Sequence, residues 1–154
     1  AMLFEQTRGV TMTLTDQKRA DMSAAAMWDN DSASKFLGIE LLSVGKGIAE
    51  MRLNVKAQHC NGHNICHGGF IFTLADSAFA FACNSYNETT VAHHNTITFV
   101  NAGQLGDVLV ANAREVSKSG RNGIYDVDVT NQNAMLIASF RGCSRTIKGQ
   151  NFPE

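Results

Sequence analysis

The sequence has little charge and no long hydrophobic run. Charged residues make up 18% of the 154 residues and the formal net charge is -1, so the sustained basic field typical of nucleic-acid binding is missing. No window reaches the ~18 consecutive apolar residues of a membrane span. The polar start EQTRGVTMTLTDQKRAD lacks the apolar centre of a signal peptide. We therefore expect a cytoplasmic protein with no nucleic-acid or membrane partner.

Proline is almost absent, occurring only at Pro153, and no repeat or low-complexity tract divides the chain. A single domain over residues 1–154 is expected, with flexible ends at about 1–12 and 149–154. The four cysteines are too few for a disulfide-stapled scaffold and are interpreted as free thiols. The charged share is below the ~25% usual for soluble domains, which favours a homo-oligomer that buries part of the exterior.

The hydrophobic periodicity predicts an α+β fold. A helix is expected over 16–29, where Thr13-x-x-Asp16 matches a capping pattern. Alternating apolar residues predict a hairpin over 38–55 with its turn at 45–47. Four further strands are expected at 90–101, 106–117, 122–131 and 134–147.

Between these strand groups, a helix is predicted over about 67–83. Its apolar residues go most of the way round, which marks a buried helix that a sheet must wrap. Asp76 is the one acid in this helix, and an ionised carboxylate is costly to bury. It is either a functional acid or an aspartate bonded to a hydroxyl at a packing seam.

Gly68-Gly69 stands where this helix should begin. Backbone N–H groups at a helix start have no intrahelical partner, so the pair could form an oxyanion site or simply a tight turn. From Gly68 to Asp76 is eight residues, or about 12 Å along a helix axis. If both act on one carbonyl, Asp76 of one chain must therefore meet Gly68 of another.

The stretch NGHNICHGGFIFTLADSAFAFACNS, residues 61–85, resembles the helix-start motif of hotdog-fold acyl-CoA thioesterases, and most of all the phenylacetate-degradation group. The resemblance covers about residues 20–148 and includes WDNDSASKFLGI, TFVNAGQLGD, GIYDVDVTNQ and FRGCSRTI. It implies an antiparallel sheet wrapped around a long central helix. It also implies a homodimer with two interface sites, paired again into a homotetramer.

The resemblance assigns roles to four residues. Asp76 acts as general base or nucleophile, and the Gly68 N–H holds the thioester oxygen. Asn61 lines the reacting centre, and His67 shapes the turn into the helix. The implied reaction is hydrolysis of an acyl-CoA, phenylacetyl-CoA or hydroxyphenylacetyl-CoA, with no metal and no cofactor beyond the coenzyme A of the substrate. Ala80 departs from related thioesterases with a glutamate, which often place a water-holding hydroxyl one turn past the acid.

Further residues are expected to bind substrate. Gly69 adjoins the proposed oxyanion donor, and polar residues of the next strand, Asn95, Thr96 and Thr98, are expected to line the acyl or pantetheine tunnel. Four cations are candidates for the coenzyme A phosphates, with plain solvated charge as the alternative for each: Lys118, Arg121, Arg141 and Arg145.

Other functions stay open at this point. Cys60, His63, Cys66 and His67 have spacings suited to zinc. Cys60 or Cys66 beside a histidine could instead be a nucleophile. The same fold could also serve a non-catalytic acyl-CoA binding protein, or a dehydratase that uses His67.

Overall fold

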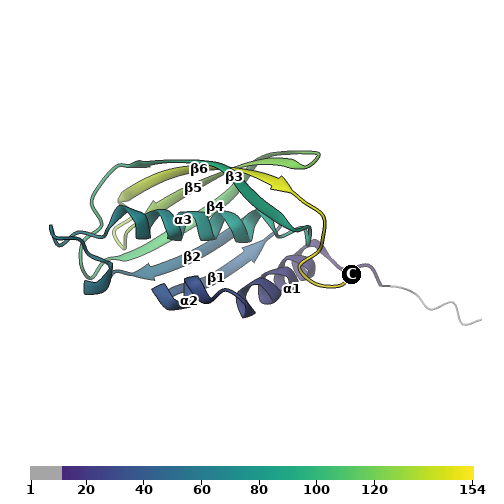
Figure 1. Cartoon of the computed structure of the whole chain (residues 1–154), viewed down its shortest axis with the longest axis horizontal. Helices are drawn as coiled ribbons and strands as arrows, with labels where there is room; N and C mark the ends of the chain where they lie inside the picture. Colours follow the sequence, from purple (N-terminus) through teal and green to yellow (C-terminus); the bar gives the residue numbers. More distant parts are fainter. Residues whose placement is uncertain (1–11) are drawn as a thin grey trace, which may run out of the picture.

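The structure is a computed structural model that describes residues 12–154, so the expected flexible segment 1–12 lies almost wholly outside the described residues (Figure 1). The helices are α1 (Asp16–Asp29), α2 (Ser32–Leu37) and α3 (Gly68–Cys83), with a short 3-10 turn at Ala57–His59. The strands are β1 (Ile39–Gly45), β2 (Ile48–Asn54), β3 (Thr90–Phe99), β4 (Val108–Ser119), β5 (Asn122–Thr130) and β6 (Leu136–Thr146). In these described residues, no helix is long and apolar enough to cross a membrane.

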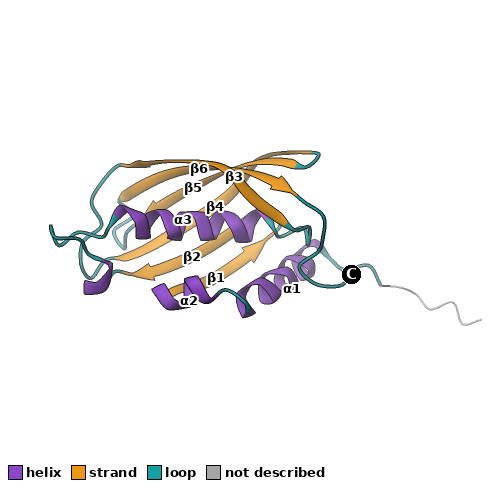
Figure 2. Ribbon diagram, viewed as in Figure 1, coloured by secondary structure: helices purple, strands orange, loops and turns teal. Residues whose placement is uncertain are grey.

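The six strands form one antiparallel sheet in the order β1-β2-β4-β5-β6-β3 (Figure 2). Helix α3 lies along one face of this sheet and contacts all six strands (Figures 1 and 2). Its buried side chains, among them Leu74, Ala78 and Phe79, form the core with the inward residues of the strands. The predicted α+β hotdog fold is confirmed, and β3 is left with one unpaired edge.

The two N-terminal helices begin and end at local signals. Thr15, rather than the predicted Thr13, caps α1 by accepting a hydrogen bond from the Lys18 N–H at 3.1 Å. Helix α2 was not predicted, because six residues carry too little periodicity. It is capped by Asp31, which accepts from the Ser34 N–H at 2.9 Å, and it ends at Gly38, whose φ of 80° favours glycine.

The C-terminal segment, expected to be flexible, is hydrogen-bonded to the rest of the chain. Asn87 Nδ2 donates to the Phe152 carbonyl at 3.0 Å, and Asn151 Nδ2 donates to Ser23 Oγ at 2.8 Å. The Arg19 guanidinium also pairs with the Glu154 carboxylate. Polar side chains of α1 and of the loop after α3 thus hold residues 151–154, a contact between chain ends that local patterns do not encode.

Strand β3 contains a β-bulge that decides which of its side chains face α3. Its pairing with β6 shifts register between Ala92 and His94, so His93 is an extra residue on this strand. Beyond the bulge Ile97 pairs with Phe140 and packs on the core. Since alternate residues of a strand share a face, Asn95 also lies on the face that meets α3.

Candidate active site

Asp76 lies in the middle of α3, half-buried among apolar neighbours. Asn95 Nδ2 donates a hydrogen bond to its Oδ1 at 2.9 Å. Burial raises the pKa of the Asp76 carboxyl above its ordinary value, and the Asn95 hydrogen bond partly opposes that rise. A partly desolvated carboxylate with a raised pKa is a stronger base than one in water.

The start of α3 offers one backbone donor. His67 caps the helix, because its Nδ1 accepts from the Gly69 N–H at 2.9 Å and its carbonyl accepts from the Phe70 N–H at 2.9 Å. Within residues 12–154 the Gly68 N–H donates to no protein atom. The available oxyanion donor is therefore the Gly68 N–H, whereas the Gly69 N–H is already occupied by the cap.

A cavity of about 350 Å³ adjoins this donor. Its lining is mostly apolar and comes from the loop before α3, the first turn of α3, the end of β3 and the loop after β3: Asn61, Ile65, Cys66, Gly68, Ile71, Phe99, Val100, Asn101, Ala102 and Gly103. Asn61 Oδ1 accepts from the His63 N–H at 2.9 Å, while its Nδ2 donates to no protein atom of residues 12–154. Asp76 is not part of the lining.

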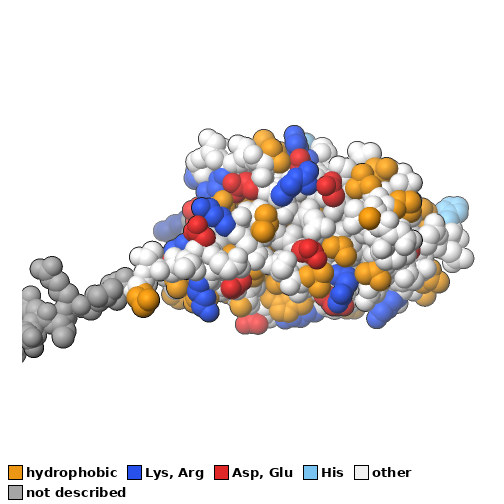
Figure 3. Space-filling view, turned by 180° about the vertical axis from the view of Figure 1, so that it is seen from behind, with side chains coloured by type: hydrophobic (Ala, Val, Ile, Leu, Met, Phe, Trp, Pro, Cys, Tyr) orange, Lys and Arg blue, Asp and Glu red, His pale blue; other side chains and the backbone are white. Residues whose placement is uncertain are grey.

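Phe99 forms an apolar wall of this cavity and was not predicted. Its ring lies directly over Gly68, where an added Cβ would come within 2.9 Å of Phe99 Cζ. Other exposed apolar side chains, Val100 and Leu105, follow it, and Figure 3 shows apolar side chains gathered at this end of the molecule. The end where α3 begins is thus both concave and apolar.

The other predicted substrate residues lie elsewhere. Thr96, Thr98 and Arg141 line a polar hollow of about 240 Å³ on the sheet face turned away from α3, so they do not face Asp76. Arg141 is held there by Asp126, with nitrogen–oxygen distances of 2.6 and 2.8 Å. This pairing lowers the pKa of the Asp126 carboxyl.

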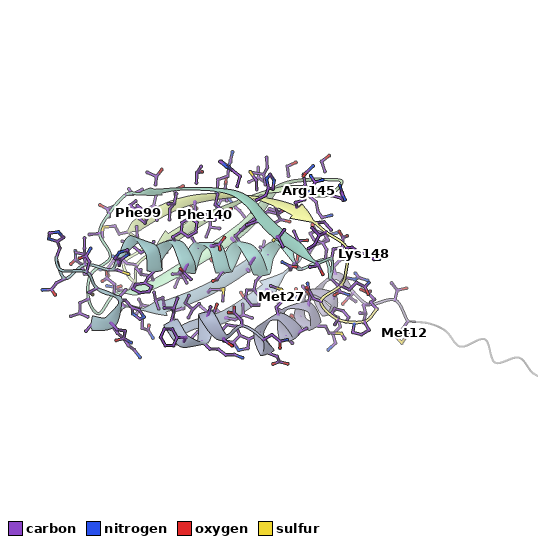
Figure 4. All side chains as sticks on the ribbon, in the orientation of Figure 1. Met12, Met27, Phe99, Phe140, Arg145 and Lys148 are labelled. Atoms are coloured by element: carbon purple, nitrogen blue, oxygen red, sulfur yellow. The ribbon has the colours of Figure 1, made fainter. Side chains whose placement is uncertain are left out.

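The remaining candidate cations differ in how far they are engaged. Lys118 lies 3.8 Å from a carboxylate oxygen of Glu88 and covers the Tyr86 ring at 4.8 Å. Arg121 and Arg145 are exposed and form no ion pair within the described residues. Arg145 lies at the end of the sheet remote from Phe99 (Figure 4).

The geometry of the described residues supports neither the zinc site nor the cysteine nucleophile. Among residues 12–154, no group of three or more histidine, cysteine or acidic side chains is arranged to hold a metal ion. Cys60 and Cys66, both free thiols, face each other across an isolated antiparallel β-bridge of the backbone in the loop before α3. His67 Nδ1 already accepts a hydrogen bond from the Gly69 N–H. Burial raises the pKa of the Cys66 thiol to about 11, which leaves little thiolate at neutral pH.

His59 is a buried residue that sequence reasoning missed. Its Nδ1 accepts from the Lys56 N–H at 2.9 Å and its Nε2 bonds the Leu37 carbonyl at 2.8 Å. Its own carbonyl accepts from the His67 N–H at 2.8 Å. His59 therefore fastens the turn before α3 to the end of α2, and no local pattern marks a histidine for such a role.

Comparison with known proteins identifies the family. The model of the thioesterase superfamily matches residues 63–138. The acyl-coenzyme A thioesterase PaaI of Escherichia coli (strain K12) is 44% identical over 131 residues, which span 85% of this chain and 94% of that protein. The chain belongs to the thioesterase superfamily.

Solved structures of similar proteins share the fold. The E. coli PaaI protein from the phenylacetic acid degradation operon is 42% identical with a TM-score of 0.87, covering 88% of this chain and 99% of that one. Smu.793 of Streptococcus mutans, bound to acetyl CoA, is 27% identical with a TM-score of 0.70, covering 73% and 90%. The resemblance to hotdog acyl-CoA thioesterases of the phenylacetate group is confirmed.

Proposed function

We propose that this protein hydrolyses acyl-CoA thioesters to the free acid and coenzyme A. The main support is that α3 carries both groups. Burial raises the pKa of the Asp76 carboxyl, and the Gly68 N–H at the start of the same helix has no hydrogen-bond partner in residues 12–154. A base and an oxyanion donor are the two groups that thioester hydrolysis requires. We also propose that the protein acts in the cytoplasm and needs no metal or cofactor.

The reaction proceeds at a site that two chains share. Asp76 lies about 12 Å along α3 from Gly68 and outside the cavity at the helix start, so one chain does not bring both groups to one carbonyl. The free edge of β3, with exposed Val91 and Phe99, supports pairing with a second copy of the chain. We propose a homodimer with two such sites, and a homotetramer formed by two dimers.

In the proposed mechanism the thioester oxygen lies on the Gly68 N–H and the Asn61 amide. Ionised Asp76 of the other chain takes a proton from water as the water oxygen attacks the carbonyl carbon. The tetrahedral intermediate then collapses, the carbon–sulfur bond breaks, and the coenzyme A thiolate takes up that proton. Direct attack by the carboxylate, giving an anhydride that water opens, also requires Asp76 to be ionised.

The coenzyme A phosphates are proposed to meet Arg121 and Arg145. Both are exposed and form no ion pair within the described residues, so binding a phosphate breaks no existing contact. Arg141, by contrast, is already engaged by Asp126.

Aryl-acetyl thioesters are the proposed substrates. A cavity of about 350 Å³ is small for a ligand pocket, and the Phe99 ring suits an aromatic acyl group better than a long chain. We expect phenylacetyl-CoA and hydroxyphenylacetyl-CoA to give a higher kcat/KM than short or long aliphatic acyl-CoAs when released thiol is measured. Faster turnover of aliphatic thioesters would overturn this specificity, and tight binding without thiol release would favour an acyl-CoA binding protein.

Complementation between two inactive variants tests the shared site. Asp76→Asn removes the base and Gly68→Pro removes the oxyanion donor, each on its own chain. After mixing and verified chain exchange, half of the dimers are mixed and each has one intact site, so about a quarter of wild-type activity should return. If mixed dimers form and show no recovery, each site lies within one chain.

A further inference from the structure

Asn95 carries a buried oxygen that bonds to nothing in the described chain. Within residues 12–154 only its Oδ1 and Arg52 Nε are fully buried side-chain nitrogen or oxygen atoms without a hydrogen-bond partner. The orientation of the Asn95 amide follows from chemistry. An ionised carboxylate only accepts hydrogen bonds, so the NH₂ group must face Asp76 and the oxygen must point away.

This arrangement is unfavourable for folding. A buried acceptor with no partner loses its bonds to water and gains nothing in exchange, so an apolar side chain of similar size would suit the same space better. The β-bulge at His93 nonetheless turns Asn95 toward α3. What the amide provides in return is its bond to Asp76, the one acid of that helix.

We propose that Asn95 is a positioning residue for Asp76, fixing carboxylate Oδ1 so that Oδ2 faces the thioester and the attacking water. The inference rests on the proposed function and adds a residue to its machinery. The same bond favours the ionised form of Asp76 against the opposing effect of burial. The Cys83 thiol, whose pKa the Asp76 charge also raises, stays neutral because burial raises its pKa to about 12.

The test replaces Asn95 by leucine, which removes the amide and keeps the volume. We expect kcat to fall about 10- to 100-fold, the scale of one hydrogen bond to a charged group, with little change in KM. The acidic limb of the kcat–pH profile should move to higher pH, because the interaction that lowers the pKa of Asp76 is lost. The melting temperature should change little, because the orphaned acceptor is gone while Asp76 loses one donor.

Matched variants separate positioning from a general effect on the sheet. Asn112→Leu makes the same change at an exposed residue of β4 and should leave kcat and its pH profile unchanged. Asn95→Asp is isosteric and places a second carboxylate beside Asp76, so it should move the acidic limb to higher pH still. Both variants are assayed beside Asn95→Leu, with thermal melts to verify folding.

A double-mutant cycle supplies the decisive comparison. In the Asp76→Asn background, Asn95→Leu should cause no further loss, because Asn95 acts through Asp76. Equal losses in both backgrounds, or an unshifted pH profile in folded Asn95→Leu protein, would overturn the positioning role alone. Absence of thioester turnover in the unsubstituted protein would overturn the proposed function, and this role with it.

Discussion

Replacing Asp76 by asparagine should lower kcat ~10²–10⁴-fold, the usual scale for one acid–base group. The asparagine keeps the shape of the side chain and still offers Oδ1 to the Asn95 amide, so the site loses its base and little else. The measurement is released thiol with phenylacetyl-CoA as substrate, together with a melting curve of each protein. Unchanged turnover in folded Asp76→Asn protein would contradict any role of this carboxylate in the reaction.

The same substitution, although it lowers kcat, should not lower the free energy of unfolding at neutral pH. Burial raises the pKa of Asp76 in the folded protein above its unfolded value of about 3.9, so folded protein binds the proton more tightly. The free energy of unfolding therefore declines as pH rises from about 4 through the folded pKa. Asp76→Asn lacks this decline, and it should be at least as stable as wild type at pH 7. The two proteins should converge in acid.

Gly68→Pro should lower kcat ~10²–10³-fold, as expected for loss of one oxyanion donor. Gly68 is the first residue of α3, a position where proline is well tolerated because its missing N–H has no intrahelical partner. His67, with φ of -58° and ψ of 131°, already has a backbone conformation compatible with a following proline. The substitution thus removes one N–H and leaves the helix intact, which kinetics with released thiol can measure.

Gly68→Ala is the matched control for that substitution. Its Cβ presses on the Phe99 ring just as the proline Cβ does, since an added Cβ lies 2.9 Å from Phe99 Cζ, but the N–H stays. The difference in kcat between the alanine and proline variants therefore isolates the donor. Equal activities would mean that the Gly68 N–H does not hold the thioester oxygen and that crowding against Phe99 accounts for the loss.

The fold could be predicted because its main signals are local. The alternation of β2 and β5 and the nearly continuous apolar surface of α3 can be recognised in the sequence without knowing which elements bury them. Helix α2 was too short to show a period. The hydrogen bonds that hold residues 151–154 depend on Asn87 and Ser23, which are far away along the chain.

The candidate site could be predicted only in part. Asp76 and Gly68 were found from their own helix, where one acid and one glycine pair stand out. Thr96 and Thr98 point away from α3 because of a bulge that the alternation of polar and apolar residues in β3 does not reveal. The engagement of Arg141 likewise depends on the register that sets it opposite Asp126.

The bulge at His93 makes the chemistry of β3 depend on the register of its pairing with β6. If β3 paired with β6 residue for residue from Ala92 onward, with no bulge, Thr96 rather than Ile97 would lie opposite Phe140, and Thr96 and Thr98 would turn toward α3. Asn95 would then face away from Asp76. Loss of the bulge at unchanged chain length, with no substitution at the site, would exchange an amide beside the acid for hydroxyl groups.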